Sequence, residues 1–222
     1  MRSMKRLLVL APAMVLLAEP ALANRVFVSN EKGNDVTVLD SETLEVIGTY
    51  PVGNRPRGIT ISPDGTELYV CASDDNLVRV FDPNTMEEMH TLPSGPDPEL
   101  FVLHPSGNPL YIANEDDNLV TVVDVKSKQV LAEIPVGVEP EGMGVSPDGK
   151  IVINTSETTN MAHFIDTTTR QIVANVLVDS RPRFAQFKRD GSELWISSEI
   201  GGTVSLIDPV KREVTGKITF EI

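Results

Sequence analysis

The chain consists of short apolar runs separated by turn residues, and this pattern returns at a fixed interval. The turn Ser62-Pro63-Asp64-Gly65 recurs in related form at 104, 146 and 188, each 42 residues further on. An Asp keeps the same register at 40, 82, 124, 166 and 208, and a Pro does so at 56, 98, 140 and 182. Three markers that stay in step along most of the chain identify an internal repeat.

Each repeat contains four strand-like runs, which in the second repeat are 58–62, 68–72, 77–82 and 88–92. The Asp-Gly pair between the first two runs favours a hairpin, because both residues tolerate positive φ. No segment shows a convincing helical period. Four strands in each 42-residue repeat predict an all-β chain, namely a β-propeller built from four-stranded antiparallel blades.

Two aligned columns in the second strand fit sheets that pack face to face. The large apolar column contains Phe27, Tyr69, Tyr111, Ile153 and Trp195. The small column, two residues further on, contains Ser29, Cys71, Ala113, Thr155 and Ser197. Cys71 is therefore predicted to be a small packed residue and not a nucleophile.

The number of strands does not complete a ring of whole blades. The chain opens on the second strand of a blade at 25–30, and four full blades follow at 57–92, 99–134, 141–176 and 183–220. Closed propellers often share one blade between the two termini, which removes the free sheet edge. The missing inner strand would follow residue 222. Either five blades close imperfectly, or the chain is the front part of a longer propeller.

The first 23 residues have the pattern of a secretory signal peptide. Basic residues at 2, 5 and 6 precede an apolar run at 7–18, and Ala21-Leu22-Ala23 forms an A-x-A cleavage site. The apolar run is too short to anchor the chain in a bilayer. We therefore expect an exported protein whose mature part, 24–222, is one propeller domain without a membrane span.

Composition narrows the classes of partner. The 222 residues include 32 acidic and 19 basic side chains, for a net charge of -13, and 41% are hydrophobic. This charge disfavours binding to nucleic acid or to an anionic membrane surface. A single cysteine excludes an intrachain disulfide and any zinc site with two or more thiolates.

A charged triplet with a central proline precedes the innermost strand of each full blade. The predicted binding residues in these triplets are Arg55, Arg57, Asp97, Glu99, Glu139, Glu141, Arg181 and Arg183. Strand order places them at the mouth of the central tunnel, where proline fixes φ and holds its neighbours in a set relation. The mouth is interpreted either as a site for a small molecule, a metal or a partner's side chains, or as salt bridges between blades worth about 0–1 kcal/mol each.

Two further features are candidates for binding. Nearby acidic loops contain Asp74, Asp75, Glu115, Asp116, Asp117 and Glu157, but they lack the Gly and terminal Glu of an EF-hand loop, so no metal site is predicted. His163 falls in a column that is otherwise Thr37, Arg79, Thr121 and Ser205. It is either a hydrogen-bonding residue of that polar column or a residue that contacts a ligand or redox metal.

Catalytic motifs are missing from the sequence. There is no Gly-x-Ser-x-Gly elbow, no pair of histidines at metalloprotease spacing and no Cys-x-x-Cys-His haem motif. The segment 144–150 resembles a phosphate loop, but Ile151 stands where Ser or Thr would bind magnesium. We expect a protein without an enzymatic activity or a cofactor.

The repeat resembles the YVTN β-propeller repeat, through FVSN at 27–30, YVCA at 69–72 and YIAN at 111–114. More narrowly, SGPDPELF at 94–101, SETTNMAHFID at 156–166 and SEIGGTV at 198–204 resemble the PQQ-dependent catabolism-associated β-propeller proteins. The resemblance covers 24–222 and implies a ring of about seven blades, of which this chain would lack roughly two at its C-terminus. PQQ binding is not implied, because propellers that bind PQQ use several tryptophan motifs and this chain has only Trp195.

The resemblance also implies where the protein acts. It points to the periplasm, beside quinoprotein alcohol oxidation and a linked transport system. The leading expectation is a non-enzymatic binding or scaffold protein, whose partner is a quinoprotein dehydrogenase, a cytochrome or a transporter component. One alternative is a lactonase-like hydrolase that uses Arg57, Glu99, Glu141, His163 and Arg183. Another is a truncated fragment without a function.

Overall fold

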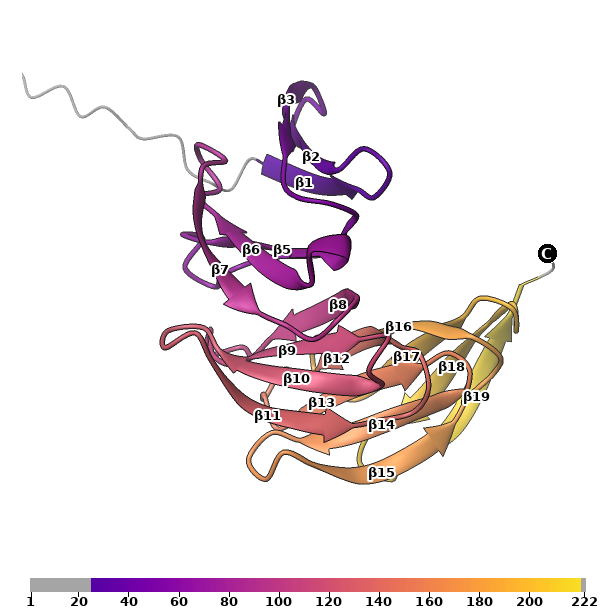
Figure 1. The fold of residues 1–222 in the computed structure, drawn as a ribbon. Coiled ribbons are helices and arrows are strands. Elements are labelled where there is room, and N and C mark those ends of the chain that lie inside the picture. Colours follow the sequence, from indigo (N-terminus) through magenta and orange to yellow (C-terminus); the bar gives the residue numbers. More distant parts are fainter. Residues whose placement is uncertain (1–24, 221–222) are drawn as a thin grey trace, which may run out of the picture.

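The computed structural model describes residues 25–220, which form five antiparallel sheets arranged side by side in an open arc (Figure 1). The first sheet has three strands: β1 (Arg25–Asn30), β2 (Asp35–Asp40) and β3 (Val46–Pro51). The next two sheets comprise β4 (Pro56–Ile61), β5 (Leu68–Ala72), β6 (Leu77–Phe81) and β7 (Glu88–Pro93), then β8 (Pro98–Leu103), β9 (Leu110–Asn114), β10 (Leu119–Asp124) and β11 (Gln129–Pro135). The last two comprise β12 (Pro140–Val145), β13 (Ile151–Ser156), β14 (Met161–Asp166) and β15 (Gln171–Leu177), then β16 (Pro182–Phe187), β17 (Leu194–Ser198), β18 (Thr203–Asp208) and β19 (Glu213–Thr219).

This architecture confirms the prediction of an all-β chain built from antiparallel sheets of the kind that form propeller blades. Within each sheet, strands that follow one another along the chain pair as neighbours. The described residues contain one short 3₁₀ turn, η2 (Ser73–Asp75), and no α-helix. Residues 25–220 therefore contain no helix that is long and apolar enough to cross a membrane. The predicted signal peptide, 1–23, lies outside the described residues.

The hydrophobic core is divided into layers, each of which lies between two successive sheets. Tyr69 and Val78 of the second sheet pack with Ile112 of the third, and Phe164 of the fourth sheet packs with Ile196 of the fifth. Cys71 is fully buried in the first of these layers, as predicted. The layers hold each sheet to its neighbours by apolar burial, worth roughly 25 cal/mol per Å².

The large apolar column is buried only where a sheet has a neighbour on that face. Tyr69, Tyr111 and Ile153 are at most 1% exposed, whereas Trp195 is 42% exposed. The expectation that every member of this column fills an interface is therefore wrong for Trp195. The physical reason is that no described sheet lies against that face of the last sheet.

The first strand of each full sheet brings the charged triplets together. β8, β12 and β16 lie next to one another in that order along the inner side of the arc, and β4 lies against β8 (Figure 1). In each strand the pairing register shifts just after the initial proline, between Pro56 and Ile59 in β4 and between Pro140 and Met143 in β12. Such bulges re-aim a side chain out of the regular pleat. The residue after each proline therefore lies in an irregular segment at the end of the inner strand.

Candidate functional site: a charged rim on the inner strands

The same backbone contacts position all four triplets. The side-chain oxygen of an Asn in the preceding sheet accepts a hydrogen bond from the backbone N–H of the first triplet residue, for example Asn118 Oδ1 from Glu139 at 3.0 Å. The carbonyl of that first residue accepts a hydrogen bond from the loop after the second strand, as Glu139 does from Glu157 at 2.9 Å. These contacts fix the entry to each inner strand and join it to the sheet before.

The side chains at these entries form one network, which we call the charged rim. Its members are Glu31, Arg55, Arg57, Asp97, Glu99, Glu115, Glu139, Glu141, Glu157, Arg181, Arg183 and Glu199. All eight triplet residues predicted from the sequence belong to it. Eight carboxyl groups therefore surround four guanidinium groups.

Arg57 is the centre of the network. Its Nη2 lies 2.6 Å from Glu99 Oε2 and 2.6 Å from Glu141 Oε1, so one guanidinium joins β4, β8 and β12. Its Nη1 lies 3.1 Å from Glu31 Oε1 in the first sheet. Arg55 reinforces the link to β8, because its Nη2 lies 2.9 Å from Glu99 Oε1. These pairs connect different sheets, as the salt-bridge interpretation of the triplets requires.

The other two arginines form the second half of the network. Arg183 of β16 lies 3.3 Å from Glu141 through Nη2 and also pairs with Glu157. Arg181 Nε lies 2.7 Å from Glu157 Oε2 and 3.3 Å from Glu199 Oε2. Glu157 thus binds both arginines of the last triplet, and the network extends through all five sheets.

Three carboxyl groups of the rim are buried, one of them being Glu157 at 5% exposed. Glu99 is 0% exposed and Glu141 is 4% exposed. Burial raises the pKa of Glu99 to about 8, with a further contribution from the negative charge of Glu141, although Arg57 and Arg55 act in the opposite direction. Burial also raises the pKa of Glu141. The charge state of Glu99 is therefore open to change near neutral pH.

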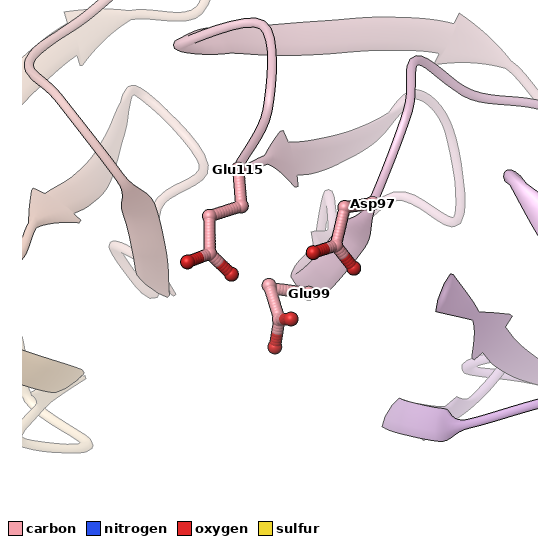
Figure 2. A group of neighbouring side chains, drawn as sticks. All are labelled: Asp97, Glu99 and Glu115. Carbon is pink, nitrogen blue, oxygen red and sulfur yellow. The ribbon is translucent and has the colours of Figure 1, made fainter. Parts of the chain in front are cut away.

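Figure 2 shows that Asp97, Glu99 and Glu115 point toward one another. One oxygen from each lies within 4.8 Å of the others, a spacing that would allow the three to share a cation. Arg55 already pairs with two of them, at 2.5 Å from Asp97 and 2.9 Å from Glu99. We call this group the carboxylate trio.

A cavity of about 400 Å³ opens beside the trio. Its lining residues are Glu115, Glu139, Glu157, Thr158, Asn160, Ser180, Arg181 and Ile200. The carboxylate of Glu139 accepts a hydrogen bond from the Thr158 hydroxyl. Among the described residues, no lysine or arginine forms an ion pair with Glu115 or Glu139, so the cavity wall presents carboxylates that internal pairing does not neutralise.

The structure does not bring His163 to the rim. The ring lies on β14 and is almost fully buried, with Nε2 accepting a hydrogen bond from the Gly137 N–H at 3.0 Å. Nδ1 lies 2.7 Å from Asn175 Oδ1 and therefore carries the proton. Burial lowers the pKa of His163. The neutral imidazole has a partner at both nitrogens and lacks contact with Arg57, Glu99, Glu141 and Arg183, with which it would form the site of a lactonase-like hydrolase.

Some rim residues were missing from the predicted set. The sequence pattern identifies Glu115 and Glu157 only as nearby acidic residues, and Glu31 and Glu199 are not among its predicted binding residues. Glu115, Glu157 and Glu199 come directly after the second strand of a sheet, and Glu31 comes directly after β1, whose sequence aligns with those second strands in the repeat. The sequence signal for these four residues is a glutamate at the same place in four repeats, directly after the aligned strand. It is comparable to the charged residues beside the repeated proline, which identify the triplets.

Comparisons with known proteins support the fold. No model of a protein family matches the chain, and no curated protein matches it. Among solved structures, a chain of hydrazine synthase from Kuenenia stuttgartiensis, a β-propeller-containing protein, is 29% identical with a TM-score of 0.72. The match covers 75% of the present chain and 49% of that chain, so the present chain spans about half the length of its structural neighbour.

Proposed function

We propose that the chain belongs to an exported, non-enzymatic scaffold protein whose fold is a seven-bladed β-propeller. This protein binds a positively charged surface of a partner through the charged rim. The partner class is a periplasmic quinoprotein dehydrogenase, its cytochrome or a component of a linked transporter. The protein would thus be an accessory to PQQ-dependent alcohol catabolism. The resemblance of 94–101, 156–166 and 198–204 to proteins of that pathway supports this placement.

The composition of the rim carries the proposal. Its eight carboxyl groups and four guanidinium groups leave excess negative charge, and the carboxylates of Glu115 and Glu139 line a cavity. Three glutamates and one arginine line this cavity, and a concave surface with an excess of negative charge attracts and orients a positively charged partner. Lysine or arginine side chains of the partner would form the ion pairs that Glu115 and Glu139 do not form with any described residue.

The rim does not favour a catalytic role. Arg57, Glu99, Glu141 and Arg183 pair with one another, and His163 lies elsewhere. Burial raises the pKa of Cys71, which disfavours the reactive thiolate. We do not propose hydrazine synthesis as an activity of this chain, because the match covers only 49% of the hydrazine synthase chain.

A charge reversal in the cavity tests the proposal. Glu139→Lys places a positive charge in the wall without breaking any ion pair of the described arginines, although it removes a more distant attraction to Arg181. Calorimetry would measure the binding of three purified candidates to the protein, each in its own titration. The candidates are periplasmic quinoprotein alcohol dehydrogenase, its cytochrome and the binding component of the transporter. We expect one of them to bind, with an affinity that falls as salt rises and falls about tenfold or more in Glu139→Lys.

The matched control is Glu87→Lys, which makes the same charge change in the turn between β6 and β7, at the far end of the sheet from the rim. It should leave the affinity within about twofold, since screening reduces the effect of distant surface charges. Equal losses in both variants would show that net charge, and not the rim, governs binding. No binding by any of the three partners would remove the proposed pathway.

A further inference from the structure

We propose that Glu99 is a proton-operated switch of the charged rim. With a proton, Glu99 donates a hydrogen bond to Glu115 and holds it in the carboxylate trio. Without the proton, Glu115 is repelled toward the cavity and takes a cationic group there. The nature of that cationic group rests on the proposed function, whereas the proton switch rests on the geometry of the trio.

The surroundings of Glu99 make its proton consequential. The side chain is fully buried, so water does not screen its charge. The titratable and charged groups that face it come from five elements or their adjoining loops: Arg55 and Arg57 at β4, Cys71 of β5, Asp97 at β8, Glu115 after β9 and Glu141 of β12. When Glu99 and the three carboxyl groups that face it are all ionised, they carry four negative charges, against the two positive charges of Arg55 and Arg57.

Glu115 is the partner best placed to respond. It is only partly buried, lies in the loop after β9 and forms no ion pair with a described lysine or arginine. Its carboxyl oxygen lies within 4.8 Å of one from Glu99, and its side chain also lines the cavity. Burial raises the pKa of Glu115, and a hydrogen bond with the Glu99 side chain acts in the opposite direction. Asp97, by contrast, is held by Arg55 at 2.5 Å. Loss of the Glu99 proton therefore replaces the hydrogen bond between the two side chains by repulsion, while the backbone N–H of Glu115 still donates to the Asp97 carbonyl at 3.0 Å.

The direction of the switch follows from simple proton exchange with solvent. Burial raises the pKa of Glu99 to about 8. Below that pH the O–H bond is intact and Glu115 stays in the trio; above it the proton leaves to water and one more negative charge remains in the rim. The affinity for a cationic group should therefore rise with pH, and binding of that group should release protons.

Two measurements on the full chain test the switch. Carboxyl-¹³C NMR from pH 5 to 10 should show a glutamate with a midpoint near 8. That signal should be absent in Glu99→Gln, which keeps the shape of the protonated side chain. In Glu115→Gln the midpoint should move down, because a neighbouring negative charge and hydrogen-bond acceptor would be lost.

Calorimetric titration with hexalysine at pH 6.5 and pH 9 provides the binding readout. We expect the wild-type affinity to rise about fivefold or more between these pH values, and the Glu99→Gln affinity to stay constant. Glu87→Gln serves as the control and should behave as the wild type. Equal pH dependence in wild type and Glu99→Gln would overturn the switch.

The two proposals can fail separately. If hexalysine binds neither form at either pH, the choice of a cationic partner is wrong, and the NMR midpoint alone decides whether Glu99 titrates as a switch. A midpoint near the ordinary glutamate value of about 4.3 would overturn the switch even if hexalysine binds.

Discussion

Glu99 shows how burial of a single side chain can set the properties of the whole rim. It is two residues from the partly exposed Asp97, yet it is fully buried, because the bulge after Pro98 turns it inward between β4 and β12. Arg55 and Arg57 compensate for much of its charge. Desolvation still outweighs them and raises the pKa of the carboxyl group to about 8.

The raised pKa predicts how stability depends on pH. In the unfolded chain Glu99 would ionise near 4.3, so between that pH and about 8 the folded chain binds more protons than the unfolded chain. Its contribution to the free energy of unfolding must therefore fall as pH rises through this window. Glu99→Gln should remove this contribution and make the protein more stable than the wild type at pH 9.

Urea unfolding at pH 5.5 and pH 9 measures the effect. The difference in unfolding free energy between the two pH values should be smaller in Glu99→Gln than in the wild type, by an amount on the order of 1 kcal/mol or more. Glu87→Gln should keep the wild-type difference. A Glu99→Gln protein with the full wild-type pH dependence would show that another group is responsible.

The sequence predicted which residues lie beside the inner strands, but not how they are buried. The repeated position on either side of a proline was enough to find Asp97 and Glu99 together. Their different environments depend on the bulge and on the arginines of the neighbouring strand, which are contacts between repeats. His163 could not be resolved from sequence, because its partners Gly137 and Asn175 come from two other segments.

At the level of elements, each sheet is tied to the next by an Asn in a left-handed conformation. Asn118 has a φ of 57° and contributes two bonds: its backbone carbonyl accepts from Val136 and its Oδ1 accepts from Glu139. Asn34, Asn76 and Asn160 do the same at the other triplet entries through Oδ1. Gly202 occupies the corresponding place in the last sheet, with a φ of 59°.

This arrangement predicts different costs for two substitutions of Asn118. Asn118→Gly retains the left-handed backbone but loses the Oδ1 acceptor, at a cost of about 1 kcal/mol. Asn118→Ala loses the acceptor and also places a Cβ in the left-handed region, which costs about 1 kcal/mol more. Chemical unfolding of the two variants checks the order. A Gly variant less stable than the Ala variant would contradict it.

The strand pattern was the most predictable part of these elements. Runs at 68–72 and 88–92 of the sequence correspond to β5 and β7 almost residue for residue. The inner strand was placed two residues late, at 58 and not at Pro56. A proline at a strand start reads as part of the turn, and the bulge that follows it interrupts the alternation of side chains.

At the scale of the whole molecule, the layered core buries the sheets in the middle of the arc more fully than the first and last sheets. Leu68 and Val70 of β5 are at most 1% exposed, whereas Val26 and Val28 at the corresponding places in β1 are 39% and 43% exposed. Trp195 shows the same difference at the other end of the arc. A repeat predicts these positions as equivalent, but their burial depends on which neighbouring sheet is present.

Trp195 provides a direct probe of this difference, because it is the only tryptophan in the chain. With 42% of its surface exposed, its fluorescence in the 222-residue protein should be readily quenched by iodide. Thr203→Trp in a Trp195→Phe background would supply a buried reference in the same sheet, provided that circular dichroism shows the native fold. Complete protection of Trp195 from iodide would contradict the exposed outer face.

The overall negative charge of the protein makes it necessary to distinguish binding at the charged rim from general attraction of cations. A net charge of -13 attracts any polycation, so affinity alone does not identify a site. The charged rim combines a cavity, two carboxylates that form no ion pair with a described lysine or arginine, and an entry loop fixed by hydrogen bonds at each inner strand. Binding there should be localised, while general attraction should be spread over the molecule.

The decisive measurement is therefore a map of binding by residue. Uniformly ¹⁵N-labelled protein would be titrated with hexalysine at pH 8.5, and the amide shifts followed by NMR. We predict the largest shifts at 97–99, 115, 139–141 and 157–160, with Glu139→Lys abolishing them. Shifts scattered over the outer strands β3, β7, β11, β15 and β19, or unchanged in Glu139→Lys, would contradict a binding function for the charged rim.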